Sequence, residues 1–467
     1  MTTQTDARGL RISTGDARSI EATDRAIDIS LRYGNPFPVL DEAIARDPGF
    51  AFGHCLKAAL LVMSTDRTLE AALRETIEAG ERISSADDRE RMHLAAARAW
   101  LDGDFALSVD RYARIAAEFP RDVLALQTAH VGSFNLGRTA ALRDVVARAL
   151  HAWDERVPGY GFVLGMLAFG LEENGDCARA EEIGRRAVEL DRRDAWASHA
   201  VAHVMEMQAR LDEGIAWLEK GSRGWDPDTA LGCHNFWHLA LYHLDAGDRA
   251  RALAIYDARV HPQPTQAVLD LIDGAAMLWR MHLAGHDVGN RFDALADDWR
   301  ARIEDGYYAF NDWNAMMAFV GAGRLADART LLGVLEGRAG EAGTNARLVA
   351  DVALPVCRAL LAFGEGRYGT SVDLLLGARE IASRAGGSNA QRDVLSLTLL
   401  EAALRSGQGA LSRALASERT RLRPTNPAAW VATARALDVS GAPAESARAR
   451  DQAQRLRATL GTAAAAA

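Results

Sequence analysis

The apolar and polar positions of this chain follow a helical pattern. Runs of about a dozen residues carry apolar side chains at i, i+3 and i+4, and each run ends at a turn before a similar run begins. The alternation of apolar and polar residues that marks strands is almost absent. The pattern therefore predicts an all-α chain built from antiparallel helix pairs.

The turns between these predicted helices recur at nearly constant spacing. Turn residues 34 or 38 positions apart, continued at slightly wider intervals, are Gly103, Gly137, Gly175, Ala209, Gly247, Gly285, Gly323, Gly366, Gly407 and Gly441. A small residue follows several of them by five positions, at Ala180, Gly214, Ala252 and Ala328. Tetratricopeptide repeats have a similar period and small residues at set offsets, so we predict a tetratricopeptide-like α-solenoid of about 10–11 repeats in a right-handed superhelix.

The regular spacing continues through nearly the whole chain, which favours one domain over several. We expect residues 19–458 to form a single helical-repeat domain. Residues 1–18 are polar and are predicted to be a flexible tail, and residues 459–467 end in an alanine run that predicts a low-complexity tail.

Composition and charge narrow the classes of function. The chain has 467 residues, of which 49% are hydrophobic, and a formal net charge of −9, which led us to expect no nucleic-acid partner. Its four cysteines are scattered, its first residues lack an apolar signal region, and no apolar run approaches the roughly 20 residues of a membrane span. These features predict a cytoplasmic protein with no membrane partner.

The histidines are placed unevenly on the repeat pattern. In such repeats the first helix lines the concave surface, and counting the turn residue as position 15 places groove-facing residues near positions 2, 5, 9, 12 and 13. His199, His203 and Glu206 take positions 5, 9 and 12 of one repeat, and His234 and His238 take positions 2 and 6 of the next. These side chains are therefore predicted to point toward one groove.

The two histidine pairs suggest a metal site. Each pair has i, i+4 spacing, which places both imidazoles on one face of a helix, and the two helices are neighbours in the stack. A ligand set of several imidazoles and a carboxylate suits zinc, copper, nickel or iron, and zinc is the metal that we expect. In this interpretation His199, His203, His234 and His238 are the ligands. Alternatively, the same histidines serve as acids or hydrogen-bond donors in a pocket without metal.

Other polar or aromatic residues fall on the same predicted surface. His93 takes position 5 of an earlier repeat, His54 takes a similar place in the first repeat, and Trp237 adjoins the second histidine pair. Asn311 and Asp312 begin another first helix, where Asp312 suits either a helix cap or a groove acid.

A glycine pair introduces a polar helix start near the C-terminal third of the chain. Asn389, Gln391, Arg392 and Asp393 follow Gly386 and Gly387 and place polar groups at a predicted helix N-terminus. Such a position suits an anionic ligand, although an ordinary helix cap explains the pattern equally well.

Several blocks of the sequence are similar to the tetratricopeptide repeat protein 38 family. The resemblance extends from about residue 30 to 430, and its blocks are residues 194–206, 233–238, 254–257, 310–312, 351–355 and 386–393. It implies a helical-repeat fold and a family found in bacteria and animals. The family pattern also includes His54, His93 and the two histidine pairs, so it selects much the same histidines as the groove geometry.

Three functions stay open from the sequence. The groove could bind a small molecule or peptide, with contacts from His54, His93, Trp237, Asn311, Asn389, Gln391, Arg392 and Asp393. The histidines could instead serve a metal-dependent hydrolase- or lyase-like enzyme in which Glu206, His238 and Asp312 are catalytic. The array could also be a scaffold for protein partners. A homodimer is compatible with each of these functions.

Overall fold

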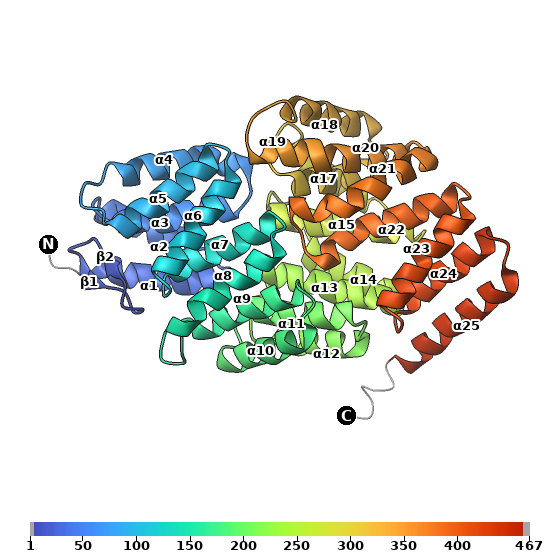
Figure 1. The fold of residues 1–467 in the computed structure, drawn as a ribbon, viewed down its shortest axis with the longest axis horizontal. Coiled ribbons are helices and arrows are strands. Elements are labelled where there is room, and N and C mark those ends of the chain that lie inside the picture. Colours follow the sequence, from blue (N-terminus) through green and yellow to red (C-terminus); the bar gives the residue numbers. More distant parts are fainter. Residues whose placement is uncertain (1–3, 461–467) are drawn as a thin grey trace.

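The computed structural model describes residues 4–460 and confirms an all-α solenoid of antiparallel helix pairs (Figure 1). The first helices of the pairs are α1 (Ala17–Leu31), α3 (Ala51–Met63), α5 (Asp88–Leu101), α7 (Val123–Asn135), α9 (Tyr160–Glu172), α11 (Ala195–Met207), α13 (Ala230–Ala246), α15 (Val268–Leu283), α17 (Ala309–Gly321), α20 (Leu354–Gly364), α22 (Asn389–Arg405) and α24 (Pro427–Val439).

The second helices alternate with the first. They are α2 (Phe37–Arg46), α4 (Glu70–Glu81), α6 (Phe105–Glu118), α8 (Thr139–Ala149), α10 (Cys177–Leu190), α12 (Leu211–Gly221), α14 (Arg249–Ile255), α16 (Arg291–Arg300), α18 (Leu325–Arg338), α21 (Tyr368–Ile381), α23 (Gly409–Leu422) and α25 (Pro443–Thr459). Shorter segments are the 3-10 turns η1 (Arg67–Leu69), η2 (Leu150–Ala152) and η5 (Ala382–Ala385), the π-helical η3 (Tyr256–Val260) and η4 (Val349–Ala353), and α19 (Thr344–Leu348).

The turns lie where the spacing predicts them. Every glycine in the predicted series has a positive φ, and Ala209, which replaces glycine in one turn, also adopts the left-handed conformation with φ 54°. The repeat frame derived from the sequence therefore applies to the structure without a shift in register.

The N-terminal segment differs from the flexible tail that the sequence suggested. Within the described part of residues 1–18, β1 (Gln4–Thr5) pairs antiparallel with β2 (Arg11–Ile12), and Ile12 is completely buried. The Ser13 amide donates to the Glu90 carboxylate at 3.0 Å, and Arg89 donates to the Arg11 carbonyl at 2.6 Å. These contacts dock the segment against α5. The predicted alanine-rich tail lies outside the described residues, apart from Thr459 and Leu460.

The solenoid closes on itself, so its later repeats cover the concave side of its earlier ones. Helix α22 packs against α15 and reaches α11, and α24 reaches α13 (Figure 1). The Trp279 indole donates to the Thr398 hydroxyl at 2.9 Å, and Arg280 donates to the Ala390 carbonyl at 2.6 Å. Contacts between residues more than a hundred positions apart therefore hold the interior closed.

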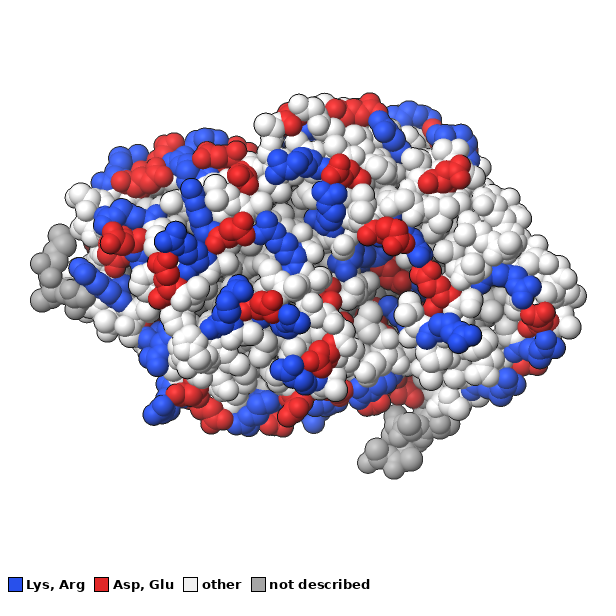
Figure 2. Space-filling model, in the orientation of Figure 1, with Lys and Arg blue, Asp and Glu red and all other residues white. Residues whose placement is uncertain are grey.

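Closure buries the central first helices on all sides. Every residue of α11 from Ala195 to Glu206 is buried, whereas the outer helix α10 buries only Ala180, Gly184 and Ala187. The surface that the sequence placed on a groove is therefore the interior of the molecule, and it reaches solvent through cavities. Acidic and basic side chains are intermixed over the outer face shown in Figure 2. No helix within residues 4–460 has both the length and the apolar character needed to cross a membrane.

Substitution of Gly214 tests whether the small residue after a turn is required for the close packing of a helix pair. A Cβ at this position would lie 2.2 Å from the Tyr242 ring, so we expect Gly214→Ala to destabilise the protein by about 1–3 kcal/mol. Gly333 in α18 has no neighbouring atom within 4 Å of such a Cβ, so Gly333→Ala should stabilise by about 0.5–1 kcal/mol. Urea unfolding measures both changes, and a loss of stability in both variants would contradict the close packing.

Candidate metal centre and adjoining cavity

Four imidazoles from α11 and α13 meet in the interior. One ring nitrogen from each of His199, His203, His234 and His238 lies within 4.8 Å of those of the other three. The His199 and His234 ring centres are 4.9 Å apart, and those of His203 and His238 are 4.6 Å apart. The i, i+4 spacing on two adjacent helices thus produces the predicted convergence. Nitrogens around a tetrahedral zinc ion lie about 3.4 Å apart, so rotations of the rings would bring them to that distance.

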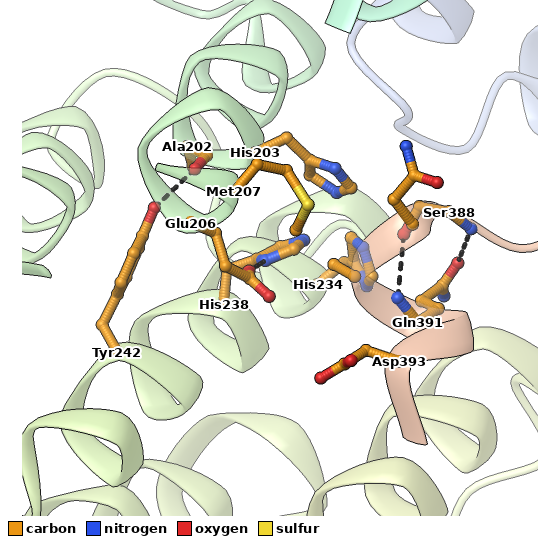
Figure 3. A network of polar contacts seen from close by, with 12 residues as sticks. Ala202, His203, Glu206, Met207, His234, His238, Tyr242, Ser388, Gln391 and Asp393 are labelled. Atoms are coloured by element: carbon orange, nitrogen blue, oxygen red, sulfur yellow. Dashed lines mark hydrogen bonds and ion pairs between the residues drawn. The ribbon is translucent and has the colours of Figure 1, made fainter. Parts of the chain in front are cut away.

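Buried acidic side chains lie beside three of the four rings. Nδ1 of His238 bonds Glu206 at 2.7 Å (Figure 3), and Nδ1 of His234 bonds Asp273 at 2.7 Å. Nδ1 of His203 lies 3.2 Å from Glu172 without a hydrogen bond. Such partners fix the orientation of a histidine and direct its other nitrogen toward a metal. Among the described residues, both ring nitrogens of His199 and of His203 and Nε2 of His238 have no hydrogen-bond partner.

Burial keeps three of the four imidazoles uncharged. Desolvation, reinforced by the neighbouring imidazoles, lowers the pKa of His199 and His238 well below the ordinary value, and burial lowers the pKa of His203 to about 4. These rings are therefore neutral near pH 7, which is the form that ligates metals. Burial, followed by the charge of Glu206, raises the pKa of Glu172 to about 8.

A cavity of about 850 Å³ opens beside the cluster. His199 and His234 lie in its wall, together with residues from α1, α3, α7, α15, α17 and the start of α22. Trp196 and Tyr33 stack in the same wall with their ring centres 5.4 Å apart. A second cavity, of about 620 Å³, lies on the Glu206 side. The cluster is thus buried in protein but accessible to a small molecule.

The polar start of α22 is a helix cap that also borders the site. Ser388 and Gln391 form a reciprocal capping box, and both line the 850 Å³ cavity (Figure 3). The backbone N–H of Asn389 donates to the Glu173 carboxylate at 2.9 Å, and the Arg392 guanidinium lies 3.6 Å from the same carboxylate. These residues therefore support the carboxylates behind His203 as well as ending the helix.

Three further residues predicted from the sequence lie in different parts of the interior. Asp393 lines the 620 Å³ cavity and is held by Arg419. Trp237 is fully buried and stacks on His234 with the ring centres 5.1 Å apart. Asn311 lines the 850 Å³ cavity and donates to the Thr65 carbonyl.

Three residues that the sequence grouped with the site are not brought to it. His93 bonds Asp122 at 2.9 Å, and His54 packs against Gly80, both in the N-terminal repeats. Asp312 lies in a separate pocket of about 10 Å³ beside Thr65. The predicted catalytic trio of Glu206, His238 and Asp312 is therefore not assembled as one group.

Three acidic residues beside the histidines were not among those predicted from the sequence. Glu172 and Glu173 precede the turn residue Gly175 and take positions 12 and 13 of their repeat, both of which face the groove. The same numbering would have found them. When Gly285 is counted as position 15, Asp273 takes position 3 of its repeat. That position is not one of those predicted to face the groove, so the sequence did not indicate Asp273.

The known structures that this chain resembles are distant from it. No family model matches the chain. Solved structures of the human IFIT1 dimer with PPP-AAAA and with m7Gppp-AAAA are each 12% identical, with TM-scores of 0.41 and 0.35, and cover 95% of this chain and 95–96% of that one. A Naa15/Naa10 structure bound to HypK-THB, 12% identical with a TM-score of 0.23, covers 95% of this chain and 64% of that chain. The chain is a tetratricopeptide-like helical-repeat protein.

One exclusion drawn from the sequence is corrected by this comparison. The net charge of −9 led us to exclude nucleic acid as a partner, yet the IFIT1 chains were solved with the oligonucleotides PPP-AAAA and m7Gppp-AAAA. Net charge describes the whole surface, whereas a ligand meets only local charges. The exclusion was therefore wrong.

The ion pair at Asp393 predicts a pH-dependent contribution to stability. Burial acts to raise the pKa of Asp393, but the guanidinium groups of Arg419 and Arg423 outweigh it and hold the pKa well below the ordinary value. A lowered pKa adds stability above the unfolded-state value of about 4, and this stability is lost as the pH falls below it. We expect Asp393→Asn to cost about 3 kcal/mol at pH 7 and progressively less below pH of about 4, as measured by urea unfolding.

An exposed ion pair provides the control for this prediction. Asp438 pairs with Arg450 at the surface, where both side chains are largely solvated. Asp438→Asn should therefore cost no more than about 1 kcal/mol at either pH. Equal and pH-independent losses in the two variants would show that the charge of Asp393 does not stabilise the fold.

Proposed function

We propose that this protein binds a transition-metal ion and that zinc is the expected metal. The ligands are His199, His203, His234 and His238, and the ion is accessible to a small molecule in the 850 Å³ cavity. The observation that carries the proposal is the combined arrangement of imidazoles and carboxylates. Three buried acidic side chains lie beside the Nδ1 atoms of His203, His234 and His238, and one ring nitrogen of each of the four histidines lies within 4.8 Å of the others. Carboxylate–histidine–metal arrangements have this form.

The enclosed site favours a small molecule over a peptide or a protein scaffold. A peptide-binding repeat array presents its first helices along an open groove, whereas α11 is buried along nearly its whole length here. Of the functions that the sequence left open, the enclosed site therefore favours the binding of a small molecule.

The hydrolase- or lyase-like alternative needs a free acid or base beside the ligand. Glu206 is engaged by His238, and Asp312 lies in another pocket. Neither residue favours catalysis over binding, so metal-dependent binding is the function proposed.

We also propose membership of the tetratricopeptide repeat protein 38 family, on the blocks quoted above. Four of those blocks, residues 194–206, 233–238, 310–312 and 386–393, contribute side chains to the histidine cluster or the 850 Å³ cavity. A cytoplasmic location and a homodimer stay predictions from the sequence.

Elemental analysis of protein purified without a histidine tag and equilibrated with zinc tests this function. We expect one ion per chain in the wild type and none in the double variant His199→Ala/His238→Ala. Glu206→Gln retains all four imidazoles but removes the carboxylate from His238, so it should weaken zinc binding about 10–100-fold in a competition titration with a chelator.

A surface histidine serves as the control for metal binding. His151 is exposed and contacts only the Arg148 carbonyl, so His151→Ala should bind zinc like the wild type. A wild-type protein that holds no metal after equilibration, or a double variant that still holds one, would contradict the metal centre.

A further inference from the structure

The lining of the 850 Å³ cavity restricts the kind of molecule that it can hold. Its walls carry many aromatic side chains, contributed by Tyr33, Phe37, Phe134, Trp196, Tyr308 and Phe310. Aliphatic residues such as Val131 and Ile272 complete the apolar surface. Cavities of this size and character bury most of a drug-sized ligand, chiefly through apolar contact.

Charge is confined to the mouth of this cavity. Among the described residues, no lysine or arginine lines it, and its two carboxylates belong to Asp226 and Asp228, which are both exposed. The 620 Å³ cavity is strongly charged instead, because six arginines and five acidic residues line it, and Arg419 and Arg435 already pair with Asp393 and Glu401. A ligand with several negative charges finds no basic side chain among the described residues that line the first cavity.

The polar groups that line the first cavity differ in whether they are already hydrogen-bonded. His199 and His234 belong to the histidine cluster, and both nitrogens of His199 and the indole N–H of Trp196 have no hydrogen-bond partner. By contrast, the Gln127 side-chain amide accepts from Ser30, and the Asn311 side-chain amide donates to the Thr65 carbonyl. The histidine cluster is therefore suited to a polar group of a ligand, while the aromatic and aliphatic wall suits an apolar body.

We infer that the cavity binds an apolar organic molecule, aromatic or branched, that carries one metal-ligating polar end. The polar end joins the imidazoles beside His199 and His234 as a further ligand, since zinc can expand beyond four-coordination. The apolar body lies against the stacked rings of Tyr33 and Trp196. This inference rests on the proposed metal centre for the polar end, whereas the preference for an apolar body depends on the cavity alone.

Two hydroxamic acids with the same polar end test the inference. Benzohydroxamic acid and acetohydroxamic acid carry one chelating group, but only the first has an aromatic body. Titration calorimetry of the zinc-equilibrated protein should give benzohydroxamic acid a dissociation constant at least tenfold lower, because burial of the ring removes more apolar surface from water. Equal dissociation constants, or no binding of either compound, would overturn the inference.

Variants that place a charge in the cavity show where the preference arises. Val131 and Met63 face the cavity from α7 and α3 and are only partly buried, so Val131→Arg and Met63→Arg change its lining without opening the core. Each should abolish the preference for benzohydroxamic acid. The matched control Leu376→Arg adds the same charge at an exposed position on α21 and should preserve it. A preference that persists in both cavity variants would overturn the inference.

A parallel titration of metal-free protein separates this inference from the proposed function. Loss of the metal weakens both hydroxamic acids, whereas the ratio of their dissociation constants still reports on the apolar wall. A protein that holds no zinc but prefers the aromatic compound would therefore refute the metal centre and support the cavity. A protein that binds zinc but shows no preference for the aromatic compound would support the metal centre and refute the inference about the cavity.

Discussion

The rest of the structure depends on the cost of burying polar groups inside a closed solenoid. An acid or base moved into a protein interior loses several kcal/mol of hydration unless a partner replaces the water. The interior here contains Glu172, Glu206 and Asp273, and each lies beside the Nδ1 atom of a histidine. His199 is the member of the cluster without such a partner. The buried acids thus lie beside three of the rings, and the four rings come together with one nitrogen each within 4.8 Å of the others.

Closure also explains why the site combines residues from distant repeats. Helices α11 and α13 provide the histidines, α9 and α15 provide carboxylates, and the start of α22 supports Glu173 through Asn389 and Arg392. In an open array each repeat would contact only its neighbours. Here α22 reaches back to the interior, so one capped helix start borders both the carboxylates and the cavity.

The local part of this architecture was predictable from the sequence, and the long-range part was not. Turn spacing located the helix pairs, and position 15 at Ala209 placed His199, His203 and Glu206 on one face. The same reasoning grouped His54, His93 and Asp312 with them, because a repeat frame specifies which face a residue occupies but not which faces meet. That depends on the small rotation added at each repeat and on where the chain returns to itself. Asp273 was missed for this reason, whereas Glu172 had a local signal that was not used.

The return of α22 to the interior has a consequence for how the chain acquires its structure during synthesis. Solenoids can form repeat by repeat, since each unit is stabilised by the one before it. In this chain the inner faces of α11 and α15 acquire their last covering only after residues near 390–400 have left the ribosome. Until then the nascent protein exposes apolar surface that recruits chaperones or other chains. The closing contacts make maturation a late cooperative event, in contrast to the gradual zipping of an open array.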